Sequence, residues 1–257
     1  MIDPANHGLL LAAGIALVLI VSSMVAALLK QRLAPHASND TIDNLITRIN
    51  AWWAMAALLG VVFWLGTLAT MLLFGFLSLL ALREFMSGVG GAGHWITGVL
   101  VCVIGIGFIP ALLVIDIPGY AGRNMYLVVF LLLVTQSSDV LQYIWGKLLG
   151  RHPVAPAISP SKTVEGLLGG VASATLLGTA VWWITPFTPV QAAGVALAIT
   201  LLGFAGGLYL SAQKRARGIK DWGRLIKGHG GVLDRLDSLW LPAPVFFIYL
   251  KLGASAS

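Results

Sequence analysis

Long apolar runs constrain this chain more than any other feature of its sequence. Of its 257 residues, 58% are hydrophobic and only 10% are charged, whereas a soluble domain carries about 25% charged residues. Several runs are long enough to cross the roughly 30 Å hydrocarbon core of a bilayer as a helix. Only helices and closed barrels satisfy their backbone hydrogen bonds in lipid, and these runs are too continuous for barrel strands. The sequence therefore predicts an all-α integral membrane protein.

The runs predict a polytopic bundle of about eight transmembrane helices, with seven or nine as alternatives. The first, at residues 8–29, is interpreted as a retained span rather than a cleaved signal, because no basic residues precede it. Residues 51–82 form one run of 32 residues. As one helix this run would be about 48 Å long, so it is either a strongly tilted helix or two helices folded back near Gly66. Further spans are expected at 95–115, 125–148, 164–184, 190–210 and 239–252.

The positions of Lys and Arg favour two helices in residues 51–82. With a break near Gly66, fourteen of the sixteen Lys and Arg residues fall in loops on one side of the membrane. An excess of basic residues marks cytoplasmic loops, so these loops are predicted to face the cytoplasm and the N-terminus to lie outside. The net charge of +6 then reflects orientation and needs no nucleic-acid partner. The cytoplasmic loops are 30–50, 83–94, 147–163 and 211–238.

The polar stretch at 211–238 carries the main candidate chemistry. It holds seven of the sixteen Lys and Arg residues and three of the ten acids. Attraction to anionic lipid explains the basic residues, but it explains neither the acids nor the glycines. Lys and Arg suit phosphate oxygens, carboxylates suit a hard divalent cation, and glycines allow close backbone approach. The stretch is therefore predicted to bind a polyphosphate and a metal ion.

Within this stretch, spacing suggests individual roles. Asp234 and Asp237 are three residues apart and are expected to share a helix face, where they can hold a divalent ion, with Arg235 turned away. His229 lies between glycines and is expected either to donate to a phosphate oxygen or to occupy a plain turn. Three basic residues either bind phosphate or only set topology: Lys214, Arg215 and Lys220.

Two features outside 211–238 point to the same chemistry. Asp139 lies within or at the end of a span, where a carboxylate is costly and is usually functional or paired. It is interpreted as a metal or nucleotide ligand, with an interhelical ion pair as the alternative. In the loop at 147–163, Lys162 lies between two hydroxyl residues, Ser161 and Thr163, either of which can cap the next helix. These residues form either a phosphate cradle at a helix N-terminus or a plain capped loop.

Four other residues are expected to be structural. Glu84 reads as a helix-end residue at the membrane interface, and Asp116 as part of a turn. Trp222 reads as an interface anchor. Cys102 is expected to be inert packing, because a single cysteine in an apolar run forms neither a disulfide framework nor a cysteine zinc site.

The polar positions together resemble the signature of the phosphatidate cytidylyltransferase (CDP-diacylglycerol synthase) family, over roughly residues 80–245. A second landmark is also similar: Asp139 is followed by Tyr143, Gly146 and the segment 159–166. The signature positions are Ser211, Lys214, Arg215, Lys220, Asp221, His229, Gly230, Gly231, Asp234, Arg235 and Asp237.

The chain departs from the family pattern just before the signature. Many bacterial members have Gly-Asp-Leu-x-Glu-Ser there, whereas this chain has Gly207 and Leu210 at the two acidic positions. The difference marks a subgroup and bears on the metal geometry and the lipid substrate. Lys227 stands where the family usually has proline, which is a minor difference.

The resemblance implies that CTP and phosphatidic acid react to give CDP-diacylglycerol and pyrophosphate, with Mg²⁺ as cofactor and a monovalent cation such as K⁺ left open. Residues 1–82 are expected to form N-terminal transmembrane helices, with a surface segment near 30–50. Residues 83–257 are expected to form a catalytic transmembrane domain. The expected location is a bacterial inner membrane, with the active site facing the cytoplasm and a homodimer left open. Implied metal ligands are Asp139, Asp221, Asp234 and Asp237; implied catalytic residues are Lys214, Arg215, Lys220, His229 and Arg235; implied substrate-binding residues are Ser159, Ser161, Lys162, Thr163, Ser211, Gly230 and Gly231.

Three alternatives stay open. One is another CTP-using lipid enzyme, either a polyprenol or phytol kinase or a cytidylyltransferase with a different lipid. A transporter is disfavoured because it would show paired repeats and broken helices near mid-membrane. A catalytically inert membrane paralogue gains some support from the missing acids at Gly207 and Leu210.

Overall fold

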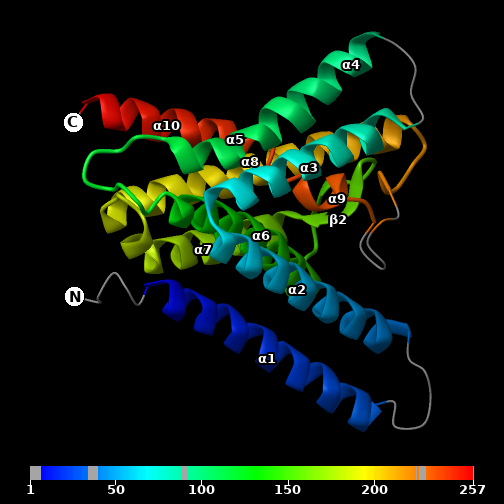
Figure 1. Ribbon diagram of the computed structural model, residues 1–257. Helices are drawn as coiled ribbons and strands as arrows, with labels where there is room; N and C mark the ends of the chain where they lie inside the picture. The colour runs from blue at the N-terminus through cyan, green and yellow to red at the C-terminus, as the bar shows by residue number, and fades with distance from the viewer. Residues whose placement is uncertain (1–6, 34–39, 88–91, 224, 226–229, 257) are drawn as a thin grey trace.

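The computed structural model describes residues 7–33, 40–87, 92–223, 225 and 230–256. These residues are almost entirely helical, and the helices lie side by side in a bundle (Figure 1). Within these described ranges, five helices are long and apolar enough to cross a membrane, and three further apolar helices are shorter. The protein is therefore a helical, polytopic membrane protein, as the apolar runs predict. The number of eight spans stays a prediction.

The first two helices form a hairpin along one edge of the bundle (Figure 1). Helix α1 (His7–Leu33) packs against α2 (Asp40–Leu65). Near their connection, Lys30 Nζ lies 2.9 Å from Asp43 Oδ1, and Trp53 Nε1 donates to Ser23 Oγ at 3.2 Å. Residues 40–50, part of the segment expected near the membrane surface, are helical and form the beginning of α2, which continues into its apolar part.

Gly66 separates α2 from α3 (Thr67–Met86). Its φ is 95°, a conformation that glycine adopts at little cost and that other residues avoid. The prediction of two helices folded back at this residue is confirmed. As a consequence, the far end of α3, which carries Glu84 and Phe85, lies beside residues of the polar stretch 211–238.

The span expected at 95–115 is built from four consecutive helical segments. They are α4 (Ala92–Gly98), the π-helix η2 (Val99–Gly105), α5 (Ile106–Ala111) and the 3₁₀-helix η3 (Leu112–Val114). Gly105 allows α10 (Pro242–Ala256) to approach, because a Cβ there would lie 2.7 Å from the Trp240 carbonyl oxygen just before that helix. The π segment thus ends where the backbone just before α10 approaches it closely.

Helices α6 (Met125–Leu149), α7 (Val164–Ala180) and α8 (Pro189–Ala216) form the centre of the molecule. Glycines bring α6 and α7 close together: a Cβ on Gly170 would lie 2.3 Å from Gln142 Cγ, and one on Gly169 would lie 2.5 Å from Trp145 Cγ. The 3₁₀-helix η4 (Trp182–Ile184) connects α7 to α8. The largest fully buried side chains around them include Phe74, Phe85, Phe130, Leu131 and Ile199.

A small β-hairpin interrupts the helical pattern between α6 and α7. Strand β1 (Pro153–Ala155) pairs antiparallel with β2 (Ser159–Thr163). The sequence predicts an extended loop here, and the structure shows that its two extended parts pair as strands. Strand β2 and the short helix α9 (Leu233–Leu236) lie at the same end of the bundle (Figure 1).

Candidate active site

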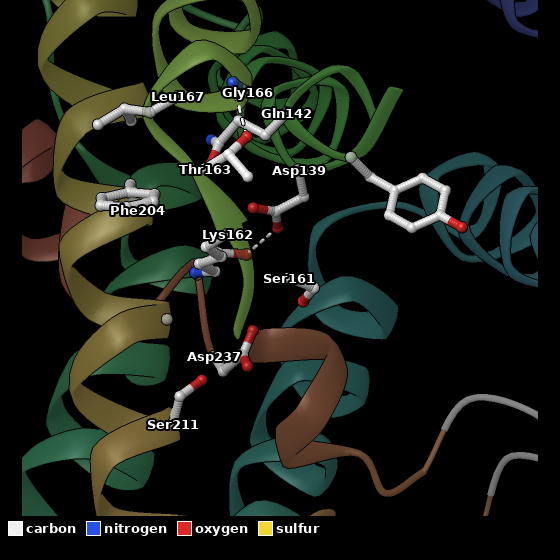
Figure 2. A pocket seen from close by; sticks show the side chains of 13 residues that line it. Asp139, Gln142, Ser161, Lys162, Thr163, Gly166, Leu167, Phe204, Ser211 and Asp237 are labelled. Atoms are coloured by element: carbon white, nitrogen blue, oxygen red, sulfur yellow. Dashed lines mark hydrogen bonds between the residues drawn. The ribbon is translucent and has the colours of Figure 1, made fainter. Parts of the chain in front are cut away.

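One pocket collects polar side chains from segments far apart in the sequence. It has a volume of about 210 Å³ and is formed by α6, β2, the start of α7, α8 and the residues that follow α9. Figure 2 shows the side chains of Asp139, Lys162 and Asp237 converging on it. The loops at 147–163 and 211–238 therefore build a single site, as charge parity predicts. The lining residues are Asp139, Gln142, Tyr143, Ser161, Lys162, Thr163, Gly166, Leu167, Phe204, Gly207, Ser211, Asp237 and Ser238.

Asp139 connects α6 to the segment after α9. Its Oδ2 accepts a hydrogen bond from Ser238 Oγ at 2.6 Å (Figure 2). Ser238 is adjacent to Asp237, so this bond fixes the position of the second pocket carboxylate relative to the first. Two carboxylates and a hydroxyl thus face one cavity.

Lys214, near the end of α8, lies between Asp234 of α9 and Asp237, which directly follows α9. Its Nζ is 2.7 Å from Asp234 Oδ1 and 3.9 Å from Asp237 Oδ2. The Lys214 side chain is 10% exposed and that of Asp234 only 4%. A buried charge is costly unless it is paired and hydrogen-bonded, and Lys214 supplies the opposite charge for Asp234. Both carboxylates therefore face the same side, toward Lys214, as their spacing predicts.

Asp234 also organises the loop that precedes α9. Its Oδ2 accepts hydrogen bonds from the backbone N–H groups of Trp222 at 2.8 Å and Gly231 at 2.9 Å. A Cβ on Gly230, whose φ is 83°, would lie 2.8 Å from the same oxygen. The glycines of the signature thus allow the backbone to fold around the Asp234 carboxylate.

Lys162 extends from β2 into the pocket. Its Nζ lies 4.7 Å from the centroid of the Phe204 ring, a cation–π contact. The position that a Cβ on Gly207 would occupy is 3.3 Å from the same Nζ. Gly207 lines the pocket whereas Leu210 is fully buried in the core. Of the two positions at which the chain lacks an acid, only Gly207 therefore borders the site.

Local contacts hold the hairpin in place beside the pocket. Thr163 caps α7, as expected, with its hydroxyl accepting from the Gly166 N–H at 3.1 Å. Arg215 donates from Nε to the Ile158 carbonyl at 3.1 Å and from Nη1 to the Ile219 carbonyl at 2.9 Å. The Arg215 guanidinium therefore binds the backbone of the hairpin to the end of α8.

Glu84 binds the backbone beside the pocket, a contact that sequence reasoning missed. It lies at the end of α3, as expected, but its carboxylate accepts hydrogen bonds from the N–H groups of Val232 at 3.0 Å and Leu233 at 2.9 Å. These donors lie 148 and 149 residues further along the chain. Backbone N–H groups carry no sequence signature, so no motif could have indicated the contact.

The interpretation of Trp222 as an interface anchor is wrong. The residue is 5% exposed, and its ring centroid lies 4.9 Å from that of Phe85. The guanidinium of Arg217 lies 4.6 Å from the Trp222 ring and 4.3 Å from the Phe85 ring, and its Nη1 donates to the Phe85 carbonyl. Trp222 therefore packs against the end of α3 instead of lying exposed at the membrane surface.

Several predicted site residues lie away from the pocket lining. Lys220 and Asp221 are exposed, and Ser159 pairs with Ala155 in the hairpin. Arg235 follows Asp234 in α9, and its carbonyl accepts from Gln136 Nε2 at 3.5 Å. His229 lies outside the described residues. The structure therefore brings together Asp139, Ser161, Lys162, Thr163, Ser211 and Asp237.

The donor set in the pocket fits a magnesium ion bound together with a phosphate-bearing substrate. Among the described residues, no group of three or more His, Cys, Asp and Glu side chains is arranged to hold a metal by itself. Mg²⁺, however, is usually held by one or two carboxylates plus substrate phosphates and water. Asp139 and Asp237 supply two carboxylates, and Ser211 and Ser238 add hydroxyls.

Comparison with known proteins covers the part of the chain that forms the pocket. The cytidylyltransferase family model matches residues 90–253, which is well over half of the chain. This chain belongs to the cytidylyltransferase family. The match contains every residue that lines the pocket. Glu84 and Phe85 lie before it.

Individual relatives match about half of the chain. An uncharacterized protein YnbB of Escherichia coli (strain K12) is 48% identical over 126 residues, which cover 49% of this chain and 42% of the relative. A phosphatidate cytidylyltransferase of Staphylococcus aureus (strain COL) is 35% identical over 130 residues, half of each chain. One of Staphylococcus haemolyticus (strain JCSC1435) is 34% identical over 154 residues, 58% of this chain and 56% of the relative. The chain thus spans about half the length of the curated relatives that it matches.

Proposed function

We propose that the protein is a phosphatidate cytidylyltransferase, which converts CTP and phosphatidic acid to CDP-diacylglycerol and pyrophosphate. The observation that carries the proposal is the pocket in which Asp139, Lys162 and Asp237 converge at the polar end of a membrane bundle. The family assignment and the names of the staphylococcal relatives support it. A site facing the cytoplasm of a bacterial inner membrane would receive CTP from solution and the lipid from the bilayer.

In the proposed reaction, an oxygen of the lipid phosphate attacks the α-phosphorus of CTP. The bond from the α-phosphorus to the bridging oxygen breaks, and pyrophosphate leaves with the electron pair. The attacking phosphate is already ionised near neutral pH, so the site needs no strong general base. Its residues act by alignment and by neutralising charge.

Each pocket residue has a role in that alignment. Lys162 is the cation within the lining and would neutralise phosphate oxygens, while Ser161, Thr163 and Ser211 would donate hydrogen bonds to them. Asp139 and Asp237 would hold Mg²⁺, which when bound supplies positive charge to the triphosphate. Lys214 contacts both Asp234 and Asp237 and holds their carboxylates close together, but it does not line the pocket.

A labelling experiment tests the proposed reaction. Purified protein in detergent, given phosphatidic acid and α-labelled CTP, is expected to transfer the label to lipid in a reaction that EDTA abolishes. With γ-labelled CTP the label is expected in pyrophosphate. Transfer of the γ-label to lipid would show a CTP-dependent lipid kinase instead. Absence of any transfer would support an inert membrane paralogue.

Metal binding is expected to weaken as the pH falls below 7. The pKa of Asp237 is raised from 3.8 to about 7. Burial is the main cause, Lys214 and Lys162 lower this pKa, and the neighbouring Asp139 and Asp234 raise it. A raised carboxyl pKa means that the ionised, metal-binding form dominates only above pH 7. The apparent Mg²⁺ affinity should therefore fall about tenfold between pH 8 and pH 6.

This pH dependence is measured without the lipid, whose phosphate titrates in the same range. Thermal shifts are recorded at rising Mg²⁺ concentration with a non-hydrolysable CTP analogue at pH 6, 7 and 8. An affinity that stays constant over this range, after correction for ionisation of the analogue, would contradict the assignment of Asp237 as a ligand.

A further inference from the structure

The end of α3 contacts the chain at two places before Asp234 and Asp237: near Arg217 and Trp222, and at Val232 and Leu233. At the first place, Phe85 packs against Trp222 and accepts a hydrogen bond from Arg217 at 3.2 Å. At the second place, Glu84 accepts from Val232 and Leu233. This helix lies before residue 90, where the family match begins. The contacts therefore join an N-terminal helix to the catalytic segment.

The Glu84 carboxylate fits a slot made by two glycines. A Cβ on Gly223 would lie 2.4 Å from Oε1, and a Cβ on Gly231 would lie 2.3 Å from Oε2. Real Cβ atoms essentially never come so close to another heavy atom. The bare backbone at both positions thus accommodates one carboxylate, with an N–H donor for each of its oxygens.

Two carboxylates together define the backbone around α9. Glu84 binds the N–H groups of Val232 and Leu233, and Asp234 binds the N–H groups of Trp222 and Gly231. A four-residue helix has little stability of its own. The direction in which Asp237 enters the pocket, directly after this helix, therefore depends on these two anchors.

We propose that Glu84 is a positioning residue for catalysis: by fixing the start of α9 from α3, it places Asp237 in the pocket. The activity tests rest on the proposed function. Glu84 accepts hydrogen bonds through both oxygens and does not line the pocket, so it acts through Asp237 and not on the substrate. The N-terminal helices then contribute to the site through α3.

The proposal predicts a loss in kcat and metal affinity rather than in lipid binding. Glu84→Ala should lower kcat about tenfold to a hundredfold, the effect of a misplacement of about 1 Å, and raise the half-saturating Mg²⁺ concentration. The KM for phosphatidic acid should stay the same. Glu84→Gln keeps one acceptor oxygen and should recover part of the loss. Arg83→Ala, on the exposed neighbour, is the matched control and should behave like the native protein.

Two further measurements keep the test independent of folding and of the reaction. Gly223→Ala leaves Glu84 in place but fills its slot, and it should reproduce the loss. Hydrogen exchange at the Val232 and Leu233 amides should be faster in Glu84→Ala than in Arg83→Ala, whatever the reaction catalysed. If the native protein makes no cytidine-bearing lipid, the proposed function fails while this exchange difference still supports the anchor. Equal exchange in the two variants, or native kcat and Mg²⁺ dependence for folded Glu84→Ala, would overturn the proposal.

Discussion

Replacing Asp237 with Asn should lower the formation of CDP-diacylglycerol about a hundredfold to a thousandfold and leave the fold intact. The substitution removes one of the two pocket carboxylates that the proposed metal needs, and losses of about this size follow removal of a group that stabilises transition-state charge. Asn has the shape of Asp but carries no charge, so the variant avoids the free-energy cost of burying a charged side chain at this position. Lys214 keeps its 2.7 Å contact with Asp234. The rate is measured with labelled CTP at saturating Mg²⁺.

Two comparisons make this result specific. Asp116→Asn changes an exposed acid in the turn before α6 and should leave both the rate and the melting temperature unchanged. Asp237→Asn should melt at the native temperature or slightly above it. A variant that keeps more than a tenth of the native rate would show that Asp237 is not needed for the reaction.

The sequence predicts the frame of this molecule because bilayer crossing imposes global constraints. The break at Gly66 was inferred from the side of the membrane on which Lys and Arg must lie, and its φ of 95° bears it out. The same parity placed Lys162 and Asp237 on one side, and both line one pocket. The positions of charged residues and the lengths of apolar runs predict the arrangement of helices because every membrane crossing meets the same physical constraints.

What the sequence does not reveal are contacts between distant segments whose partners are ordinary. Glu84 reads as a helix-end acid because its donors are backbone N–H groups on another segment. The sequence suggests an interface residue at Trp222, because no residue near it in the sequence indicates that it packs against the Phe85 ring. Both contacts depend on where α3 ends in space. The position of a helix end relative to a distant loop is set by packing rather than by local pattern.

The basic residues of the signature show a related difficulty. Lys214, Arg215 and Lys220 look equivalent as phosphate ligands in the sequence, but the structure distinguishes them. Lys214 is buried against Asp234, Arg215 binds backbone carbonyls of the hairpin and of the loop after α8, and Lys220 is exposed. Side-chain charge alone cannot separate a buried countercharge from a surface cation. Burial separates them, and the burial of Lys214 follows from the position of α9, which packs against α3 and places Asp234 beside Lys214 at the end of α8.

Replacing Lys214 with Met should destabilise the protein by about 3–5 kcal/mol, the cost of leaving a buried charge without its partner. The Asp234 side chain is only 4% exposed, so water cannot replace the ammonium. Asp234→Asn should cost less, because the remaining Lys214 has a second acid, Asp237, at 3.9 Å. The double variant Lys214→Met/Asp234→Asn should recover much of the loss, since neither partner then carries a buried charge. Unfolding is followed in detergent by heat and by denaturant.

The exposed ion pair of the N-terminal hairpin is the matched control for this cycle. Lys30 lies 2.9 Å from Asp43, but their side chains are 51% and 41% exposed, and such surface pairs contribute about 0–1 kcal/mol. Lys30→Met should therefore change the melting temperature little, although the two lysines have nearly the same contact distance. If both lysine variants destabilise the protein equally, burial does not determine the strength of the Lys214–Asp234 pair. The anchoring of α9 would then have to come only from the hydrogen bonds that the Asp234 and Glu84 carboxylates accept from backbone N–H groups.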